Sequence, residues 1–161
     1  MDNKISVNHV VSSFQTTYET FISRFESRLG RHDISAYWDL VADPDRAKDG
    51  EAVLRRQEGS SGLMLFTTYD HGTLLNIKGA QRKARQYVVG NPLYAARMTQ
   101  HDIRAALYAP LRVLVYADDS GGTHVEYDLP SSLFGQLEND KVNEVAAELD
   151  QKMSALVEKS S

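Results

Sequence analysis

The hydrophobic pattern near the N-terminus changes from a strand-like run to a helical period. Residues 5–13 favour a first strand. In the next segment five apolar side chains recur every three or four residues and so share one face of a helix: Tyr18, Phe21, Ile22, Phe25 and Leu29. Thr16 and Glu19 have the spacing of a capping box, and Gly30 is a typical helix stop. We therefore predict a strand followed by an amphipathic helix.

Residues 31–61 interrupt this regular pattern. The segment is polar, contains Pro44 and closes on glycine and serine residues, with a short helix expected near Glu51–Gln57. It is too short and too polar to bury a core of its own. We interpret it as an insertion or flap within a single domain that spans residues 1–161.

The middle of the chain is rich in β-forming residues separated by turns. Residues 63–79 predict two strands around a turn at Asp70-His71-Gly72, and a third strand is expected from about Ala84 to Val89. Residues 111–129 form the clearest hairpin pattern, because two β-forming arms flank a loop of turn residues at 118–122.

A last helix is predicted from about Asp140 to Val157. Its apolar residues fall on one stripe, with Glu and Lys opposite: Val142, Val145, Leu149, Met153 and Leu156. A strand, a helix, a run of strands and a final helix together indicate an α+β domain. We expect a mostly antiparallel sheet with the helices packed on one face and the other face open.

The residues Gly90-Asn91-Pro92 end a strand abruptly. Asn91 is a favoured N-cap, Pro92 suits the first helical position, and Gly90 permits a positive φ or a close backbone approach. Thr99 and Asp102 frame a second capping box, which predicts one broken helix or two short ones. Plain capping explains the turn. The alternative is that its backbone N–H groups bind an anion.

Composition narrows the classes of function. The 161 residues include no cysteine, which excludes disulfides, thiolate catalysis and thiolate metal sites and fits a cytoplasmic location. The net charge of −4 argues against a nucleic-acid partner. No apolar run approaches the ~20 residues of a membrane span, and the N-terminus has no apolar region typical of a secretory signal. We expect no nucleic-acid partner and no membrane.

The charge is unevenly distributed along the chain. Residues 78–112 contain seven basic residues and one acidic residue, whereas residues 113–161 contain three basic and ten acidic residues. The two segments can pair within the fold or across a dimer. The alternative is that the basic segment meets an anionic ligand.

The predicted hairpin concentrates polar chemistry on one face. If Ala117 opposes Thr123, the alternation of a strand places one set of side chains together: Arg112, Leu114, Tyr116, His124, Glu126 and Asp128. Such a set could bind a polar ligand or perform general acid–base catalysis. The alternative is ordinary cross-strand pairing on a solvated or dimer-buried face.

His71 is a further candidate, because it follows Asp70 at a turn. A neighbouring carboxylate can fix the tautomer of a histidine and raise its pKa. The alternative is a turn histidine held by local hydrogen bonds. The five histidines show no helical His-x-x-x-His pair, and no glycine-rich phosphate loop follows a strand. We therefore expect neither a metal site nor a nucleotide cofactor.

Four motifs in order resemble the family catalogued as domain of unknown function 302: YDHG at 69–72, VVGNP at 88–92, PLRVLVYADDSG at 110–121 and VEYDLPSSL at 125–133. The resemblance covers about residues 61–137 and, more loosely, the first strand and helix. It implies a fold like that of the TATA-binding-protein superfamily, with a curved antiparallel sheet, and a dimeric assembly. It implies no established reaction or cofactor. The segment 31–61 departs from the shorter family pattern.

Two classes of function remain. The first is a homodimer that binds a small polar or anionic molecule without a cofactor. The alternative is a cofactor-free enzyme of the isomerase, lyase or cyclase type, in which His71 and Glu126 transfer protons. In either case we predict that these two residues border a pocket together with the ligand-binding candidates Asp70, Gly90, Asn91, Arg112, Tyr116 and His124.

Overall fold

The computed structural model describes residues 4–161. A six-stranded open sheet has the strand order β1-β6-β5-β4-β3-β2, and only the β2–β3 pair is parallel. The strands are β1 His9–Phe14, β2 Gly30–Arg31, β3 Met64–Asp70, β4 Ala84–Gly90, β5 Leu111–Ala117 and β6 Thr123–Asp128. The helices are α1 Tyr18–Arg28, α2 Trp38–Ala42, α3 Ala47–Gln57, α4 His71–Leu74, α5 Pro92–Thr99, α6 Pro130–Phe134 and α7 Asp140–Glu158. The predicted α+β class is confirmed.

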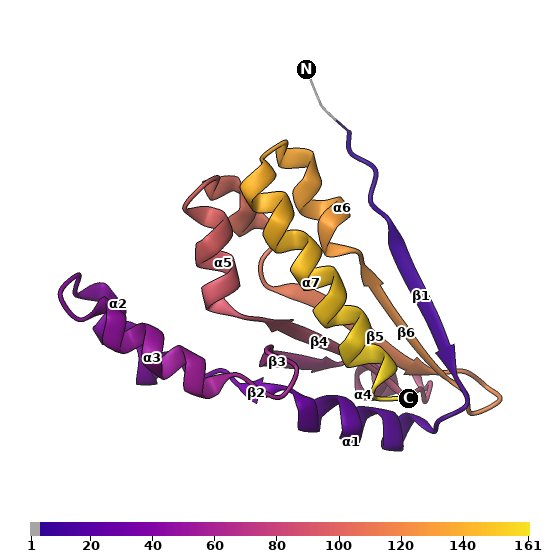
Figure 1. Ribbon diagram of the computed structural model, residues 1–161. Helices are drawn as coiled ribbons and strands as arrows, with labels where there is room; N and C mark the ends of the chain where they lie inside the picture. The colour runs from indigo at the N-terminus through magenta and orange to yellow at the C-terminus, as the bar shows by residue number, and fades with distance from the viewer. Residues whose placement is uncertain (1–3) are drawn as a thin grey trace.

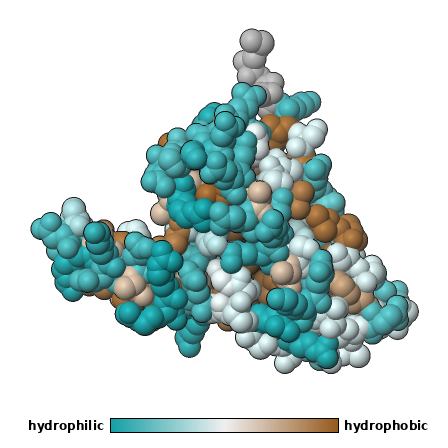
Figure 2. All heavy atoms as spheres, in the orientation of Figure 1, coloured by the Kyte–Doolittle hydropathy of each residue, from teal (hydrophilic) through white to brown (hydrophobic). Residues whose placement is uncertain are grey.

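The main core lies between one face of the sheet and the helices, with α7 running across the strands (Figure 1). The predicted stripe of α7 is buried throughout, because each of its five residues is at most 3% exposed: Val142, Val145, Leu149, Met153 and Leu156. Phe21 and Phe25 of α1 are fully buried, and the Phe25 ring packs 5.0 Å from that of Tyr87 in β4. Figure 2 shows mostly hydrophilic atoms over the outer, solvent-facing side of these helices.

Helix α1 begins one residue later than its capping pattern predicted. The Oγ1 of Thr17, not that of Thr16, accepts the backbone N–H of Thr20 at 3.3 Å. The chain leaves the helix at Leu29, and Gly30 already belongs to β2. The predicted Thr16 cap is therefore wrong by one residue, whereas the helix and its end directly before Gly30 are confirmed.

The predicted second strand after β3 is wrong, because the chain there is helical. Asp70 acts as an N-cap: its carboxylate accepts both the backbone N–H and the hydroxyl of Thr73, each at 2.8 Å. This local capping starts α4, and a 3₁₀ turn at Leu75–Lys78 follows directly. Strand β4, predicted as the third strand, and the β5–β6 hairpin are confirmed.

The Gly90-Asn91-Pro92 turn caps α5 as predicted. The side-chain oxygen of Asn91 accepts the backbone N–H of Leu93 at 2.9 Å, and Pro92 is the first helical residue. A Cβ at Gly90 would lie 3.3 Å from the Cβ of Pro110, so the glycine permits a close approach of two segments. The span to β5 holds two short helices, α5 and a 3₁₀ turn at Ile103–Leu107.

Residues 31–61 form a projecting arm with a small core at its base. Helices α2 and α3 pair as a hairpin that extends away from the sheet (Figure 1). Tyr37, Leu54 and Met64 fasten the arm to β3, and each is at most 6% exposed. The chain enters and leaves the arm at Gly30 and Gly59, where a Cβ on either glycine would overlap the other segment's backbone. Within residues 4–161 no helix is long and apolar enough to cross a membrane.

Candidate functional site

The face of the sheet away from the helices, called the open face below, carries the polar side chains that the hairpin pattern predicted. Ala117 pairs with Thr123, Tyr116 with His124 and Leu114 with Glu126, so the predicted register is confirmed. Strand β1 extends this face on the far side of β6. Its alternate residues His9, Val11 and Ser13 pair with Asp128, Glu126 and His124, respectively.

His9 lies between two carboxylates. Its Nε2 is 2.8 Å from Oε2 of Glu126, and its Nδ1 is 2.9 Å from Oδ1 of Asp128. Both ring nitrogens can donate to carboxylates only when the ring is protonated. The hydrogen bonds to Asp128 and Glu126 accordingly raise the pKa of His9 above its ordinary value.

Tyr116 completes this chain of hydrogen bonds. Its hydroxyl donates to the other oxygen of Glu126, Oε1, at 2.7 Å. The Tyr116 and His9 hydrogen bonds lower the pKa of Glu126, and the bond to Glu126 raises the pKa of Tyr116. We call Tyr116, Glu126, His9 and Asp128 the His9 relay, because a proton donor and a proton acceptor alternate along it.

A second chain of hydrogen bonds runs beside the relay. The Oγ of Ser13 is 2.8 Å from Nδ1 of His124, and Nε2 of His124 is 2.7 Å from Oδ2 of Asp118. The His124 ring also stacks on Tyr116, with centroids 5.1 Å apart. The Ser120 hydroxyl and His124 hold the pKa of Asp118 well below its usual range. Asp118 therefore fixes the orientation of His124 next to the relay.

A hollow of about 460 Å³ opens beside the relay, and we call it the open-face hollow. Arg112 of β5 and Asp128 of β6 supply its charged groups, while Val88, Leu107 and Leu133 are among its apolar walls. The Asp128 carboxylate bonds to His9, and Arg112 forms no ion pair within residues 4–161. The hollow thus offers a free guanidinium next to a carboxylate that is held in place.

His71 and Asp70 do not join this site. They lie at the end of β3, and the strand order places β3 three strands from β6, or about 14 Å away at the usual strand spacing. The Asp70 carboxylate caps α4, and the His71 side chain is exposed to solvent. The structure therefore brings Tyr116, His124 and Glu126 together on one face but does not bring His71 to them.

Gly90 and Asn91 line a different hollow, on the helix side of the sheet. Asn91 is 5% exposed, and both its side-chain nitrogen and its side-chain oxygen form hydrogen bonds within the protein. Beyond its cap to Leu93, its Nδ2 donates to Oε1 of Glu58 at 2.9 Å and to the carbonyl of Gly62 at 3.0 Å. These two bonds fasten the end of the arm to α5, and the bond from Leu93 confirms Asn91 as the N-cap of the helix.

Sequence reasoning missed His9 and Ser13 as members of the site. Both alternate with half-buried residues along β1, so their common face was visible in the pattern. The pattern did not show which strand lies next to β1, because β1 pairs with β6, more than 100 positions away in the sequence. Asp118 was assigned only to a turn, although it also reaches His124.

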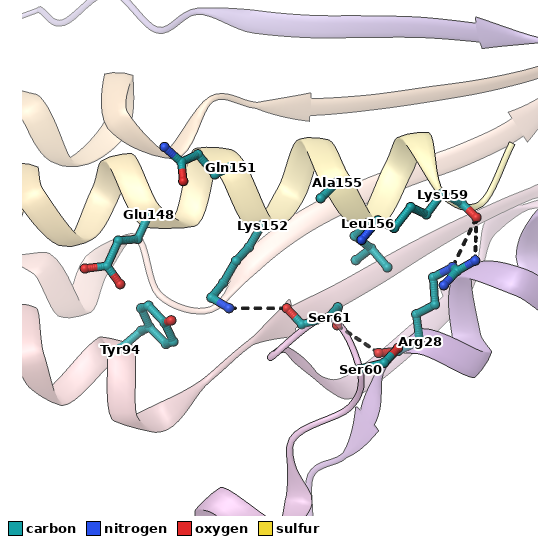
Figure 3. A pocket seen from close by; sticks show the side chains of 10 residues that line it. All are labelled: Arg28, Ser60, Ser61, Tyr94, Glu148, Gln151, Lys152, Ala155, Leu156 and Lys159. Carbon is teal, nitrogen blue, oxygen red and sulfur yellow. Dashed lines mark hydrogen bonds between the residues drawn. The ribbon is translucent and has the colours of Figure 1, made fainter.

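A basic hollow of about 470 Å³ lies between α7 and the loop before β3 (Figure 3). Arg28 donates two hydrogen bonds to the carbonyl of Lys159, at 3.1 and 2.7 Å. Nζ of Lys152 lies 3.5 Å from the carbonyl of Ser61 and 5.4 Å from the Tyr94 ring centroid. These cations hold the C-terminal helix to the core. Across residues 4–161 no cluster of three His, Asp or Glu side chains is arranged to hold a metal ion.

Comparisons with known proteins identify a family. No curated protein matches the chain. A solved structure, the crystal structure of the uncharacterized conserved protein DUF302 from Bacillus stearothermophilus, matches over 95% of this chain and 98% of its own, with a TM-score of 0.65 and 17% sequence identity. At that identity the likeness shows the fold alone. The family model for the domain of unknown function DUF302 matches residues 44–160, so α3 lies within the family pattern. The chain therefore belongs to the DUF302 family.

Proposed function

We propose that this protein binds a small organic acid in the open-face hollow. The observation that carries the proposal is the guanidinium of Arg112, which lines the hollow and has no ion-pair partner among residues 4–161. A guanidinium can hold a carboxylate through two parallel hydrogen bonds. Arg112 would supply that contact without breaking an existing one.

The rest of the hollow narrows the class of ligand. Asp128 can accept a hydrogen bond from a hydroxyl or an amine on the same ligand, while Val88, Leu107 and Leu133 offer apolar contacts. The favoured ligand is thus a small hydroxy or amino acid with an apolar part. Tyr116, Glu126 and His124 would not touch the ligand but would hold His9 and Asp128 in position.

The alternative function is proton transfer on such a ligand by a cofactor-free enzyme. One observation favours it: the imidazole of His9 lies between the carboxylates of Glu126 and Asp128, and the Tyr116 hydroxyl donates to the same Glu126. Groups of this kind supply general acids and bases in isomerases and lyases. On this view Glu126 keeps the role predicted from the sequence, and His9 takes the role that was predicted for His71.

A binding screen tests the proposal. Isothermal calorimetry with a panel of small hydroxy and amino acids should find a ligand that the wild-type protein binds. Arg112→Gln should weaken that binding by about tenfold or more, the loss expected for one charge-assisted contact. Arg55→Gln is the matched control, because Arg55 is an exposed arginine of the arm that pairs with Glu51. Equal affinity of the two variants would disprove the assignment of Arg112.

Solvent exchange separates binding from catalysis. If the protein transfers protons, incubation of the bound acid in deuterated water should place deuterium on its carbon skeleton, as detected by NMR. His9→Gln should stop this exchange, whereas Arg55→Gln should not. A ligand that binds in the hollow without exchanging hydrogen supports the binding function alone.

We also propose that the protein is a homodimer and that it is cytoplasmic. Exposed apolar side chains on the arm support the dimer: Trp38 is 59% exposed and Ile34 51%. The lack of cysteine supports the location. Light scattering should give twice the 18.0 kDa mass of one chain, and Trp38→Ser should reduce it towards one chain. Cell fractionation tests the location.

A further inference from the structure

The hollow behind the Gly90–Pro92 turn, called the aromatic hollow below, is separate from the open-face hollow. It has a volume of about 350 Å³ and lies between α5, α7 and the base of the arm. Residues 109–111 line both hollows, one on each side of this segment. Its deeper walls are apolar and include Met98, Phe134 and Leu149, each at most 3% exposed.

The polar residues of the walls are His32, Tyr37, Asn91 and Tyr94. The Asn91 side chain is bonded to other protein groups, and His32 and Tyr37 bond to each other. Nε2 of His32 lies 2.7 Å from the hydroxyl of Tyr37, a residue that is 6% exposed. The His32 ring stacks on Phe66, with centroids 4.1 Å apart and planes at 26°. Burial lowers the pKa of His32 and so favours its neutral form. In the neutral pair the Tyr37 oxygen keeps a lone pair that can accept a hydrogen bond from a ligand.

The walls contain no aspartate, glutamate, lysine or arginine. A charged ligand would lose its hydration there and find no opposite charge in return. A flat apolar ligand would gain from leaving water and from contact with the aromatic rings. The polar pair adds a requirement for one hydrogen-bonding group on the ligand.

From this geometry we propose that the aromatic hollow is a second binding site, which takes a neutral planar aromatic molecule with one N–H or O–H group. His32 and Phe66 provide the stacking surface, and the Tyr37 oxygen accepts the ligand's hydrogen. The hollow is close to the smallest volume of small-molecule pockets, about 300 Å³, so it suits a ligand of one ring or of two fused rings. The site stands whether or not the open-face hollow binds an acid.

Indole is a suitable probe, because it is neutral and planar and carries one N–H group. In ¹H–¹³C NMR spectra of the wild-type protein, indole should shift the Met98 methyl signal and show nuclear Overhauser contacts to it. Benzoate, which is of similar size but charged, should give neither effect. Absence of the indole contacts at millimolar concentration, or equal binding of benzoate, would overturn the proposal.

Two neighbouring alanines of α5 provide a matched pair of variants. Ala95 lines the hollow, whereas Ala96 is exposed and does not. Ala95→Phe should fill the hollow and weaken indole binding at least tenfold, while Ala96→Phe should bind as the wild type does. Tyr37→Phe should weaken indole binding but leave that of naphthalene unchanged. A folded Ala95→Phe variant that binds indole normally would also overturn the proposal.

Discussion

The two faces of the β5–β6 hairpin differ in character: one packs into the core, and the other carries polar side chains. On the helix side Val113, Val115 and Val125 are fully buried in the core. On the other side Tyr116 and Glu126 are partly exposed and join the His9 relay. Because side chains alternate along a strand, a change at one position alters the core while a change at the next position alters the open face. The comparison predicts that stability and ligand binding can be altered separately within this hairpin.

The largest expected effect is a difference in stability between alanine variants of two adjacent residues of β5. Val115→Ala should lower the free energy of unfolding by about 2–3 kcal/mol, because it removes two buried methyl groups and leaves a cavity. Leu114→Ala, on the open face, should cost less than about 1 kcal/mol, because Leu114 is only half-buried. Urea denaturation measures both values. Similar costs at the two positions would contradict the separation of the faces.

Asn91 is a polar residue on the helix side of the sheet, and we expect it to contribute to stability. Asn91→Ser keeps a capping oxygen but loses the hydrogen bonds to Glu58 and Gly62. It should therefore cost about 1–2 kcal/mol. Asn91→Asp should not do better, since its carboxylate would face that of Glu58. Thermal unfolding tests both variants, and a stability equal to wild type for Asn91→Asp would show that the contact to Glu58 is unimportant.

The smallest effect concerns the protonation of His9. Its pKa is raised in the folded state, so its stabilising contribution is complete below the unfolded value near 6.5 and is lost as pH rises through the folded value. NMR titration should place the pKa of His9 above 6.5. Glu126→Gln should lower that pKa, because it removes one of the two carboxylates. Asp118→Asn is the control, because Asp118 bonds to His124 rather than to His9. A His9 pKa that Glu126→Gln leaves unchanged would contradict the relay.

The sequence predicted the elements whose patterns are strong and local. The α7 stripe, the N-cap at Asn91 and the register of the hairpin each follow from residues close together in the chain. The strand expected after β3 is absent, because a local capping interaction there outweighs the apolar pattern. Apolar residues there suggested a strand, but the cap from Asp70 to Thr73 started a helix instead.

The site was predicted only in part, because it depends on strand order. The alternation of β5 and β6 correctly placed Tyr116, His124 and Glu126 on one face. Alternation does not show which strand lies next to which, so His9 was missed and His71 was assigned to a site three strands away. The aromatic hollow was also missed, since His32 and Tyr37 belong to the segment that was interpreted as an insertion.

The glycine crossing at the base of the arm has an evolutionary consequence. Gly30 and Gly59 lie in contact, so the 28 residues between them leave the sheet and return at almost the same point. Lengthening such a loop costs little entropy, and a short turn could close it. Deleting the arm would remove His32 and Tyr37 but would leave β1 and the hairpin unchanged. Selection could therefore alter one hollow through insertions and deletions while the other changed only by point substitution.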